Sequence, residues 1–484
     1  MSVTEEARNV LLRRIDWRFF VQSTDELHVS APTDAMADSL ALVSAGGEPD
    51  LAVLVDPSTR ELAAAAASLP PGGTLYVEWY RPRLGGRRRL TRELERTGLT
   101  DVRWYWPWPR PSKSPTFWLP LDAPDALAFF LAQRHRSASL RRRIPTAIWP
   151  IVRRLGLLVP VCAVSRKPGG ISDPVDEAVR LHAAGGRVSW ILLSGGRRTI
   201  NKVVGLPVVE PAKRPQLVVK FARSAVEDEP LRHEFDVLRA VAAARPDQRG
   251  VPRALFLERR AGRIALGETA LEGEPLIWRL DRGKLDPFCA LVTDWLVGLV
   301  DPLRTHDGDW RRRLIDEPLE RFARDYASVV TAEELERARA ELASLPALHI
   351  TCEQRDCAPW NVLLDGDTVS VADWESAEPS GLPALDLIYF LANAALVADG
   401  VLDTGPVAPG YLESLRTLAK HASRYCERTG LDEALLPTLR LLCWTIHARS
   451  EAIRFELDAA GAPSPDQLES GVFLALWRAE LGCR

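Results

Sequence analysis

The chain has 484 residues, of which 46% are hydrophobic and 26% are charged, and its formal net charge is −3. Because this length exceeds what one hydrophobic core serves, we expect two or three domains. The hydrophobic and charged fractions exclude wholesale disorder. The near-zero net charge argues against a dedicated nucleic-acid-binding protein, which usually carries a strongly basic domain.

The seven cysteines are scattered, and none has CxxC spacing. Cys352 and Cys357 lack a second Cys or His pair at the distance that a zinc site requires, so we expect reduced thiols. The N-terminal residues lack the apolar core of a signal peptide. These features predict a cytoplasmic protein.

The most hydrophobic stretch, residues 147–164, contains Arg153 and Arg154. Two arginines in the middle of the stretch argue against a membrane span. We expect a helix there that leads into a buried strand, and a surface-lying amphipathic segment is the alternative.

Residues 24–168 alternate short apolar runs with segments of helical pattern. Strands are expected at residues 26–30, 50–55, 73–79, 102–107, 117–121 and 158–165, and helices at 31–44 and 60–69. This alternation predicts an α/β domain with a doubly wound, mostly parallel sheet. Proline and glycine in residues 166–174 place its end near residue 170.

The later strands of this first domain resemble the class I S-adenosylmethionine-dependent methyltransferase fold. The resemblance depends on DLAVLVD at residues 50–56, LPPGGTLYVEW at 69–79 and VPVCAVSRKP at 159–168. In that family a glycine-rich turn follows the first strand, whereas residues 31–35 read APTDA. No second strand ends in an acidic residue that could hold a ribose. We therefore expect residues 1–170 to be a degenerate methyltransferase-like domain with a structural or substrate-presenting role.

An aromatic cluster, WYWPW, occupies residues 104–108. Alternation along a strand that ends at prolines explains it by core or interface packing. Stacking against a ligand is the alternative.

Residues 171–271 are expected to form a small β-rich lobe, and residues 272–484 a helical lobe. The expected strands are 188–193, 199–209, 215–223, 253–256 and 264–271, and the expected helices are 227–244, 289–303, 319–330 and 332–342. Between the first two strands the turn Ser194-Gly195-Gly196 could lay backbone N–H groups over phosphates, although most such turns are plain hairpins.

Lys220 lies in an apolar strand between Val219 and Phe221, where an unpaired ammonium group is costly. Glu234, on the helix that follows, is the expected partner. Together they could present a fixed positive charge to phosphate oxygens. The alternative is a lysine on the solvent face of the strand.

Residues 348–391 carry the pattern that points to chemistry: LHITCEQRDCAPWNVLLDGDTVSVADWESAEPSGLPALDLIYFL. Asp356 and Asn361 lie five residues apart in a loop, and Asp373 follows a short apolar strand at 369–372. Phosphoryl transfer from a nucleotide needs a carboxylate that accepts the proton of the attacking hydroxyl, oxygen ligands for Mg²⁺ and a cation that fixes the nucleotide. Asp356 fits the role of the proton acceptor, Asn361 and Asp373 fit that of the Mg²⁺ ligands, and Lys220 fits that of the cation.

Residues 180–484 resemble the aminoglycoside phosphotransferase/choline kinase family. The resemblance depends on RDCAPWNVLLD at 355–365, VADWE at 371–375 and LPALDLIYFL at 382–391. It implies a two-lobed protein-kinase-like fold and an ATP- and Mg²⁺-dependent kinase that phosphorylates a hydroxyl of a small molecule.

The resemblance also implies a role for each matching residue. Asp356 would be the catalytic base, Asn361 and Asp373 the magnesium ligands, and Asp386 a brace of the catalytic loop. Lys220 and Glu234 would anchor the nucleotide phosphates, and Ser194, Gly195 and Gly196 would form the loop over them. The backbone from Glu268 to Leu271 would bind the adenine.

One departure concerns the catalytic loop, which in the family usually begins His-Gly-Asp and here reads Gln354-Arg355-Asp356. Arg355 must adopt a backbone conformation that glycine adopts more easily. The three residues expected to act on phosphate and metal are nevertheless present. Two alternatives stay open beside an active kinase: a non-catalytic nucleotide-binding pseudokinase scaffold, and a bifunctional protein with residual methyltransferase activity.

The acceptor is expected to be a small molecule such as an aminoglycoside, choline or a sugar. Glu451, Glu456 and Asp458 could bind amino groups of a cationic substrate, but a solvated helix face is the favoured interpretation. Trp374 and Trp444 could line an acceptor pocket, although such aromatics usually lie in the core. The oligomeric state does not follow from the sequence.

Overall fold

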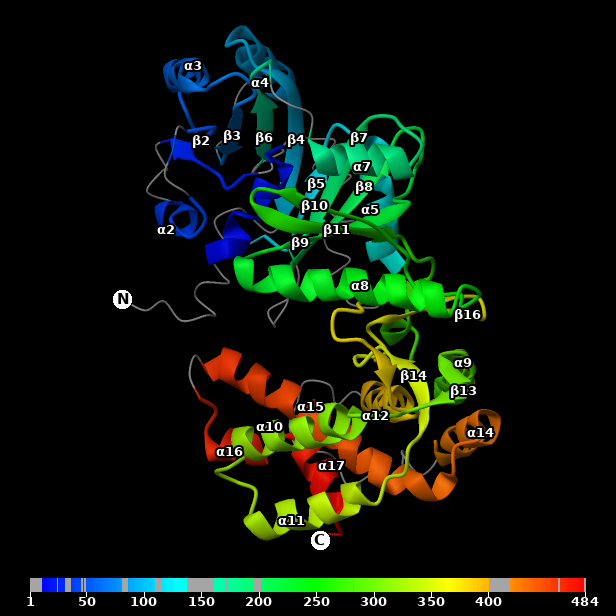
Figure 1. The fold of residues 1–484 in the computed structure, drawn as a ribbon. Coiled ribbons are helices and arrows are strands. Elements are labelled where there is room, and N and C mark those ends of the chain that lie inside the picture. Colours follow the sequence, from blue (N-terminus) through cyan, green and yellow to red (C-terminus); the bar gives the residue numbers. More distant parts are fainter. Residues whose placement is uncertain are drawn as a thin grey trace. The chain divides into compact units, whose positions relative to one another are not determined.

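The structure is a computed structural model of the whole chain, shown in Figure 1. It describes residues 11–482 except 24, 31–35, 45–46, 48, 81–85, 109–114, 137–160, 170–172, 195–201, 282, 400–417 and 460–461. The chain forms two compact units. The first comprises Met1–Arg232 and Ala254–Ala270, and the second comprises His233–Arg253 and Leu271–Arg484.

The first unit is built on one large sheet. In chain order its strands are β1 (Val29–Ser30), β2 (Leu51–Val55), β3 (Thr74–Trp79), β4 (Thr100–Trp108), β5 (Phe117–Pro120), β6 (Val161–Arg166), β7 (Val188–Leu193), β8 (Lys202–Val209), β9 (Leu217–Ala222), β10 (Ala254–Arg260) and β11 (Arg263–Thr269). Its helical segments are the 3₁₀ segment η1 (Asp16–Phe20), α2 (Ala37–Leu40), α3 (Thr59–Ser68), α4 (Gly86–Arg96), α5 (Pro124–Arg136), α7 (Pro174–His182) and η3 (Ala225–Glu227). Helix α8 (Asp228–Ala244) begins in the first unit and continues into the second.

The expected mostly parallel sheet is wrong. The eleven strands lie in the order β1-β2-β3-β6-β4-β5-β7-β8-β9-β11-β10. Only the β1–β2 and β2–β3 pairs among these described strands are parallel. A parallel pair needs a crossover, which α2 and α3 supply, whereas short connections such as the one between β7 and β8 produce antiparallel hairpins. The chain is therefore a mixed α/β protein with a mixed sheet.

The sheet continues through the boundary expected near residue 170. Strand β5 pairs with β7, with Phe117 opposite Leu193 and Trp118 opposite Leu192. The two parts expected at 1–170 and 171–271 thus share one sheet, because an edge strand left open by one part is completed by the other.

The side chains of the sheet alternate between two cores. On β4, Trp104 and Trp106 belong to the core that α3, α4 and α5 cover, whereas Tyr105 belongs to the opposite core. The aromatic cluster expected to pack does so, and the Trp104 ring stacks on Trp79 at 5.3 Å. Period-two alternation on a sheet with both faces covered explains why nearly every position of this strand's second half is apolar.

The segment η1 supplies aromatic rings to the second of these cores along much of its length. Trp17 stacks on Tyr76 of β3 at 3.8 Å, Phe20 on Tyr105 at 3.8 Å, and Phe19 on Phe221 of β9 at 4.8 Å. These rings come from both parts that the sequence predicted to be separate domains. Residues 16–20 therefore join the first strands to the last strands of the sheet.

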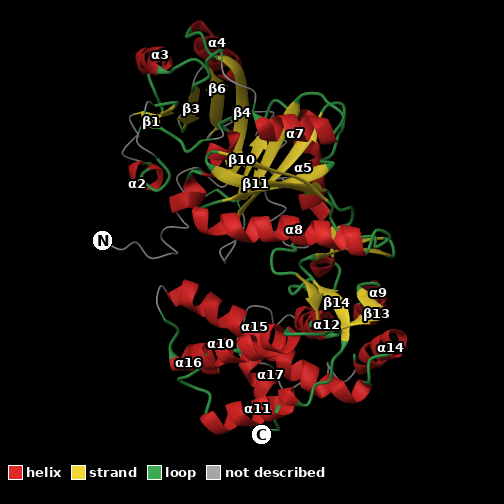
Figure 2. Cartoon of the chain, viewed as in Figure 1, coloured by secondary structure: helices red, strands yellow, loops and turns green. Residues whose placement is uncertain are grey.

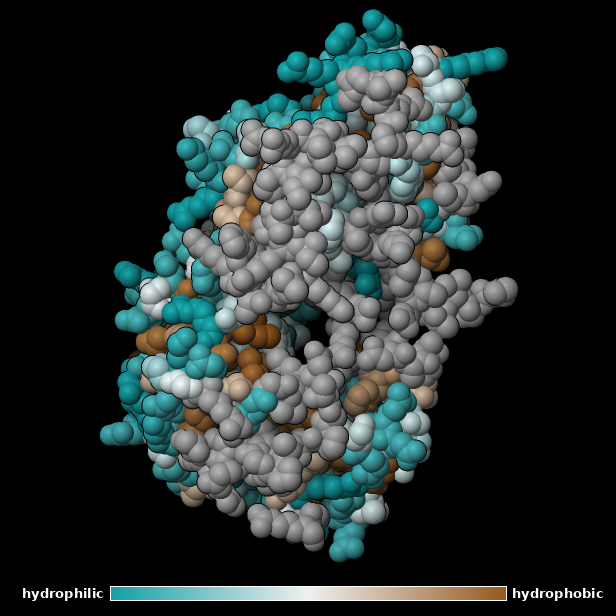
Figure 3. Space-filling model, turned by 180° about the vertical axis from the view of Figure 1, so that it is seen from behind, coloured by the Kyte–Doolittle hydropathy of each residue, from teal (hydrophilic) through white to brown (hydrophobic). Residues whose placement is uncertain are grey.

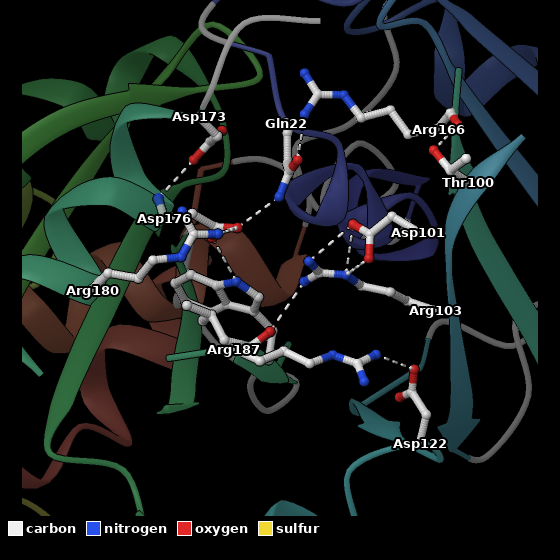
Figure 4. Close-up of polar contacts among 12 residues, drawn as sticks. Gln22, Thr100, Asp101, Arg103, Asp122, Arg166, Asp173, Asp176, Arg180 and Arg187 are labelled. Carbon is white, nitrogen blue, oxygen red and sulfur yellow. Dashed lines mark hydrogen bonds and ion pairs between the residues drawn. The ribbon is translucent and has the colours of Figure 1, made fainter. Parts of the chain in front are cut away.

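A buried polar network also crosses this unit (Figure 4). Gln22 lies between two charged groups: it accepts a hydrogen bond from Arg166 at 2.6 Å and donates one to Asp176 at 2.6 Å. Asp176, on α7, also accepts hydrogen bonds from Trp190 and from Arg260. Burial raises the pKa of Asp176, but the charges of Arg260 and Arg103 and the hydrogen bonds from Arg260 and Trp190 together lower it below its usual value, so the group stays ionised. A satisfied network of this kind fixes the relative position of the strands that carry it.

The second unit is mostly helical, as Figure 2 shows. Its helices are α9 (Leu285–Val297), α10 (Glu317–Asp325), α11 (Ala332–Ala343), α12 (Leu385–Ala398), α14 (Ala419–Thr429), α15 (Leu436–Ala459), α16 (Pro465–Glu469) and α17 (Val472–Glu480). Two small sheets accompany them, β12-β15-β16 and β13-β14-β17. Their strands are β12 (Glu274–Pro275), β13 (Val300–Thr305), β14 (His349–Glu353), β15 (Val362–Asp365), β16 (Thr368–Val371) and β17 (Glu378–Gly381).

One expected helix in this unit is wrong in its second half. The helix expected at 289–303 ends at Val297, and Val300–Thr305 forms strand β13, which pairs with β14. The break falls at Gly298, whose weak helix propensity permits the chain to leave the helix there. The apolar pattern continues across the break, which is why sequence periodicity alone did not reveal it.

Cys162, Cys289, Cys352, Cys357, Cys426 and Cys443 are free and buried, as expected for reduced thiols, and Cys483 lies outside the described residues. Among the described helices, none combines the length and apolarity that a membrane crossing requires. Most of residues 147–164 fall outside the described part of the chain, but the expected buried strand is present as β6. On the face shown in Figure 3 the described surface is mostly hydrophilic, with hydrophobic residues in small separate patches.

Candidate active site

The candidate active site of the second unit is a loop between two strands. Strand β14 ends at Glu353, the loop of residues 354–361 follows, and the hairpin β15–β16 leads to Asp373. Asn361 lies next to this exit, because the backbone N–H of Ala372 donates to the Asn361 carbonyl at 2.9 Å. The chain thus returns Asp373 to the loop that carries Asp356 and Asn361.

Asp356 and Asn361 are hydrogen-bonded to each other. The Asn361 amide Nδ2 donates to Oδ2 of Asp356 at 2.7 Å and to its backbone carbonyl at 2.9 Å. Because the amide nitrogen is used in this way, the Asn361 Oδ1 remains as a ligand atom. The hydroxyl of Tyr389 donates to the other carboxylate oxygen of Asp356, Oδ1, at 3.3 Å.

The electrostatics favour a carboxylate that can take up a proton. Burial, with a smaller contribution from the charge of Asp373, raises the pKa of Asp356 to about 7, although hydrogen bonds from Asn361 and Tyr389 lower it. A general base works best when its pKa lies near the operating pH. Asp356 therefore has the properties of a proton acceptor, in a site where a second carboxylate is close by.

Asp386 braces the loop, the role that the sequence resemblance implied for it. Its Oδ2 accepts the backbone N–H of Gln354 at 2.6 Å, and its Oδ1 accepts that of Arg355 at 2.8 Å. Burial raises the pKa of Asp386 to about 7, and the charge of Glu353 raises it as well. The carboxyl is enclosed and holds the backbone that precedes Asp356.

The two unusual loop residues both have defined partners. The Gln354 side chain accepts the N–H of Asp356 at 2.9 Å and donates to the carbonyl of Ala372 at 3.0 Å and to that of Asp373. Arg355 has φ = +64°, a conformation that favours glycine, and its guanidinium pairs with Glu353 at 2.8 Å. Arg355 therefore points to Glu353, its neighbour at the end of β14.

Three carboxylates, that of Asp373 among them, lie close together. One oxygen each from Glu234, Asp373 and Glu375 lies within 4.8 Å of the other two. The Trp374 backbone N–H donates to Glu234 Oε1 at 2.8 Å, which holds Glu234 against this segment. An all-oxygen donor set of this kind fits a hard cation such as Mg²⁺. Sequence reasoning missed Glu375, although its place two residues after Asp373 was visible.

Lys220 and Glu268 belong to the first unit. The Lys220 ammonium lies 3.2 Å from Glu268 Oε1, and both side chains are almost fully buried. They come from the adjacent strands β9 and β11, on which Lys220 is opposite Leu266 and Glu268 is opposite Val218. Lys220 is therefore buried rather than on a solvent face, and the structure identifies Glu268 as a partner that the sequence analysis did not propose.

The other expected nucleotide residues are placed as follows. Ser194 is buried directly after β7, and Gly195 and Gly196 lie outside the described residues. Leu271 and Glu234 belong to the second unit, so the expected pairing of Glu234 with Lys220 stays a prediction.

The structure bears on two expectations about the acceptor pocket. Glu451 is buried and accepts the N–H groups of Val472 and Phe473, so it caps the N-terminus of α17, and the solvated face favoured for it is wrong. Trp374 and Trp444 are buried core residues, as their spacing indicated. The side chains of Glu456 and Asp458 lie outside what the structure describes.

A cavity of about 470 Å³ lies in the first unit at the amino ends of β2 and β3. Asp50, Gly73 and Arg166 are among the residues that line it. Open α/β sheets bind dinucleotide-like ligands beyond the carboxyl ends of their parallel strands, and this cavity is at the opposite ends. It does not correspond to the place where a methyltransferase cofactor would be expected.

Comparisons with known proteins give structural neighbours only. No family model and no curated protein matches the chain. The solved structures similar to it include the aminoglycoside phosphotransferase APH(3'')-Id from Streptomyces rimosus, at 18% identity and a TM-score of 0.36 over 62% of this chain and 100% of that one. Another is a thermostable mutant of APH(4)-Ia in complex with ADP and hygromycin B, at 15% identity and a TM-score of 0.41 over 63% of this chain and 98% of that one. A choline/ethanolamine kinase family protein from Mesorhizobium loti is similar at 14% identity and a TM-score of 0.35 over 64% of this chain and 92% of that one. At these values the similarity carries no functional conclusion for this chain.

Proposed function

We propose that the protein transfers the γ-phosphoryl group of ATP to a hydroxyl group of a small molecule, with Asp356 as the base. The observation that carries the proposal is the arrangement of Asp356, Asn361 and Asp373 in one loop and the strand exit beside it. A half-buried carboxylate with a raised pKa beside further carboxylate and amide oxygens is what phosphoryl transfer to an alcohol requires.

In this proposal Asp356 orients the acceptor hydroxyl and accepts its proton as the oxygen attacks phosphorus. The Asn361 amide holds one carboxylate oxygen of Asp356, so the proton is taken by the other. Gln354 and Asp386 hold the loop backbone through its N–H groups, which keeps the base in place without reorganisation during the reaction.

Asn361, Asp373 and Glu375 are the residues that would hold Mg²⁺, which when bound neutralises charge on the phosphates. The support for this set is its oxygen-only chemistry and the short distances among the carboxylates. We expect Lys220 to bind nucleotide phosphate oxygens. Glu268 and Glu234 are expected to hold its ammonium group in position. Ser194, Gly195 and Gly196 are expected over the phosphates, and Leu271 beside the adenine.

We infer that the first strands of the chain have a structural role and do not bind S-adenosylmethionine. Supporting observations are the shared sheet and the rings of η1, which unite residues 16–20 with the strand that carries Lys220. In this view the N-terminal part of the chain stabilises the sheet from which Lys220 projects.

The test of the proposed function is ATP turnover with Mg²⁺ and a panel of aminoglycosides, amino alcohols and sugars. Asp356→Asn should abolish transfer to the acceptor and leave ATP binding within about twofold of the wild type, since the base does not contact the nucleotide in this mechanism. Asp365→Asn, an exposed residue at the end of β15, is the control and should turn over normally. Undiminished transfer by Asp356→Asn would refute the assignment of the base. ATP binding without any transfer by the wild type would favour the pseudokinase alternative, and binding of S-adenosylmethionine the bifunctional one.

A further inference from the structure

Helix α12 contributes two residues to the loop of Asp356. Asp386, in its first turn, accepts two backbone N–H groups of the loop. Tyr389, three residues later, lies on the same face of the helix and reaches the Asp356 side chain with its hydroxyl. One helix therefore fixes both the backbone and the carboxylate of the proposed base.

The two oxygens of the Asp356 carboxylate have different donors. Oδ2 accepts from Asn361 at 2.7 Å and Oδ1 accepts from Tyr389 at 3.3 Å. A single donor leaves the carboxylate free to rotate about its terminal bond, whereas two donors on different oxygens restrict that rotation. The orientation of the remaining lone pair of Oδ1, which would take the acceptor proton, then depends on Tyr389.

The Tyr389 ring is itself held in place. It lies 3.7 Å from the His447 ring, centroid to centroid, with 14° between the planes, and Phe473 is 5.9 Å away. Burial, together with the charge of Arg355, lowers the pKa of His447 to about 3, so the stacked imidazole is neutral at physiological pH. The hydroxyl is thus presented from a rigid, uncharged stack.

We propose that Tyr389 is a positioning residue, which sets the orientation of the Asp356 carboxylate toward the acceptor hydroxyl. The inference rests on the proposed phosphotransfer and extends it to a residue that does not touch substrate. Tyr389 acts on the step in which the O–H bond of the acceptor breaks and its proton passes to Asp356. It does not act on nucleotide binding.

Tyr389→Phe tests this role, because phenylalanine keeps the ring and its stacking but removes the hydroxyl. We expect kcat to fall about three- to tenfold, the range that one hydrogen bond is worth, while KM for ATP and the Kd for ATP with Mg²⁺ stay within twofold. Tyr326→Phe is the matched control. Tyr326 is also a buried tyrosine of this unit and donates to the carbonyl of Ala448 on α15 at 2.7 Å, and its replacement should leave kcat unchanged.

The outcomes separate the inference from the proposed function. A fall in kcat in Tyr389→Phe alone, at unchanged KM for ATP and with thermal unfolding within a few degrees of the control variant, supports the inference. Full kcat in Tyr389→Phe, or an equal fall in both variants, overturns it while the proposed function stands. Absence of transfer by the wild-type protein across the whole acceptor panel overturns the proposed function and the inference with it.

Discussion

The side-chain amide of Gln354 donates to the backbone carbonyl of Ala372 at a distance of 3.0 Å. This hydrogen bond joins the start of the candidate catalytic loop to the residue before Asp373. The same side chain accepts the N–H of Asp356, so one glutamine is bonded to both sides of the site. A neutral histidine also has one ring nitrogen to donate and one to accept, so it could offer the same pair of groups as glutamine.

Replacing Gln354 by alanine should therefore weaken both stability and turnover. The partly buried N–H of Asp356 and the carbonyl of Ala372 would each lose a partner, and we expect a loss of about 1–3 kcal/mol in the free energy of unfolding. Gln354→His should recover most of this loss. Gln467→Ala on α16, where the glutamine caps an exposed N–H, should cost less than about 1 kcal/mol. Chemical denaturation of the three variants measures this, and equal stability of Gln354→Ala and wild type would contradict it.

Arg355→Gly should destabilise the protein even though it relieves backbone strain. Glycine at φ = +64° gains about 1 kcal/mol over a residue with a side chain. Against this, the change leaves Glu353, which is 1% exposed, without its cation, and removing one partner of a buried pair costs about 3–5 kcal/mol. We expect a net loss of about 2 kcal/mol in the free energy of unfolding. The loss is smaller than for a fully buried ion pair because Arg355 is partly exposed.

The double variant Arg355→Gly with Glu353→Gln decides between these two effects. Without the unpaired charge the relief of strain remains, and denaturation should show that the double variant is more stable than Arg355→Gly alone. If the double variant is the less stable of the two, the ion pair is not the reason for retaining arginine in this conformation.

Asp16→Asn should destabilise the first unit. Asp16 pairs through both oxygens with Arg223, at 3.1 and 2.8 Å, and both side chains are fully buried. Arg223 also donates to the Ser194 carbonyl at 3.0 Å. Loss of one charge leaves Arg223 buried and uncompensated, and we expect a loss of about 3–5 kcal/mol.

The exposed pair Asp294–Arg424 provides the comparison, since Asp294→Asn should cost about 1 kcal/mol or less. Circular dichroism during thermal unfolding measures both variants. If Asp16→Asn unfolds at the same temperature as Asp294→Asn, then residues 16–20 are not a structural part of this sheet.

Glu78 should make stability depend on pH. Burial raises the pKa of Glu78 to about 7, against hydrogen bonds from Tyr80 and Tyr76 that lower it. Between about pH 4.5 and 7 the folded state binds more protons at this group than the unfolded state does, so stability falls as pH rises through this range. Glu78→Gln cannot ionise and should be more stable than wild type by about 3 kcal/mol at pH 8, with little advantage at pH 4.5.

The control for this prediction is Glu427→Gln, at an exposed position of α14. Its stability difference from wild type should not change with pH by more than a few tenths of a kcal/mol. A Glu78→Gln variant whose advantage is the same at both pH values would contradict the role of ionisation.

Local patterns in the sequence predicted most elements well. Strand β7 (Val188–Leu193) has the expected bounds, and α11 and α8 begin and end within one residue of expectation. Strand direction and order could not be predicted in the same way, because they depend on pairing between distant segments. The pairing of β5 with β7, which joins two expected domains, leaves no signal in either strand alone.

The same distinction holds for the candidate site, where local spacing could be predicted and pairing between distant segments could not. Asp356, Asn361 and Asp373 were found because their spacing is local, and Asp386 because it follows them closely. The pairing of Lys220 with Glu268 was missed because it joins two strands about fifty residues apart, and α8 offered a glutamate nearer in sequence. The contact of Tyr389 with Asp356 was missed for a similar reason, since a tyrosine in an apolar helix has the pattern of a core residue.

The most direct test of the account is a calorimetric titration of ATP into the wild-type protein with Mg²⁺, beside the same titration of Asp373→Ala and of wild type with EDTA. The account predicts a single binding event for wild type with Mg²⁺, weakened at least tenfold in Asp373→Ala and by removal of the metal, because Asp373 is the carboxylate that would hold Mg²⁺ against the phosphates. Absence of binding by a folded wild-type protein, or equal binding by Asp373→Ala, would contradict it.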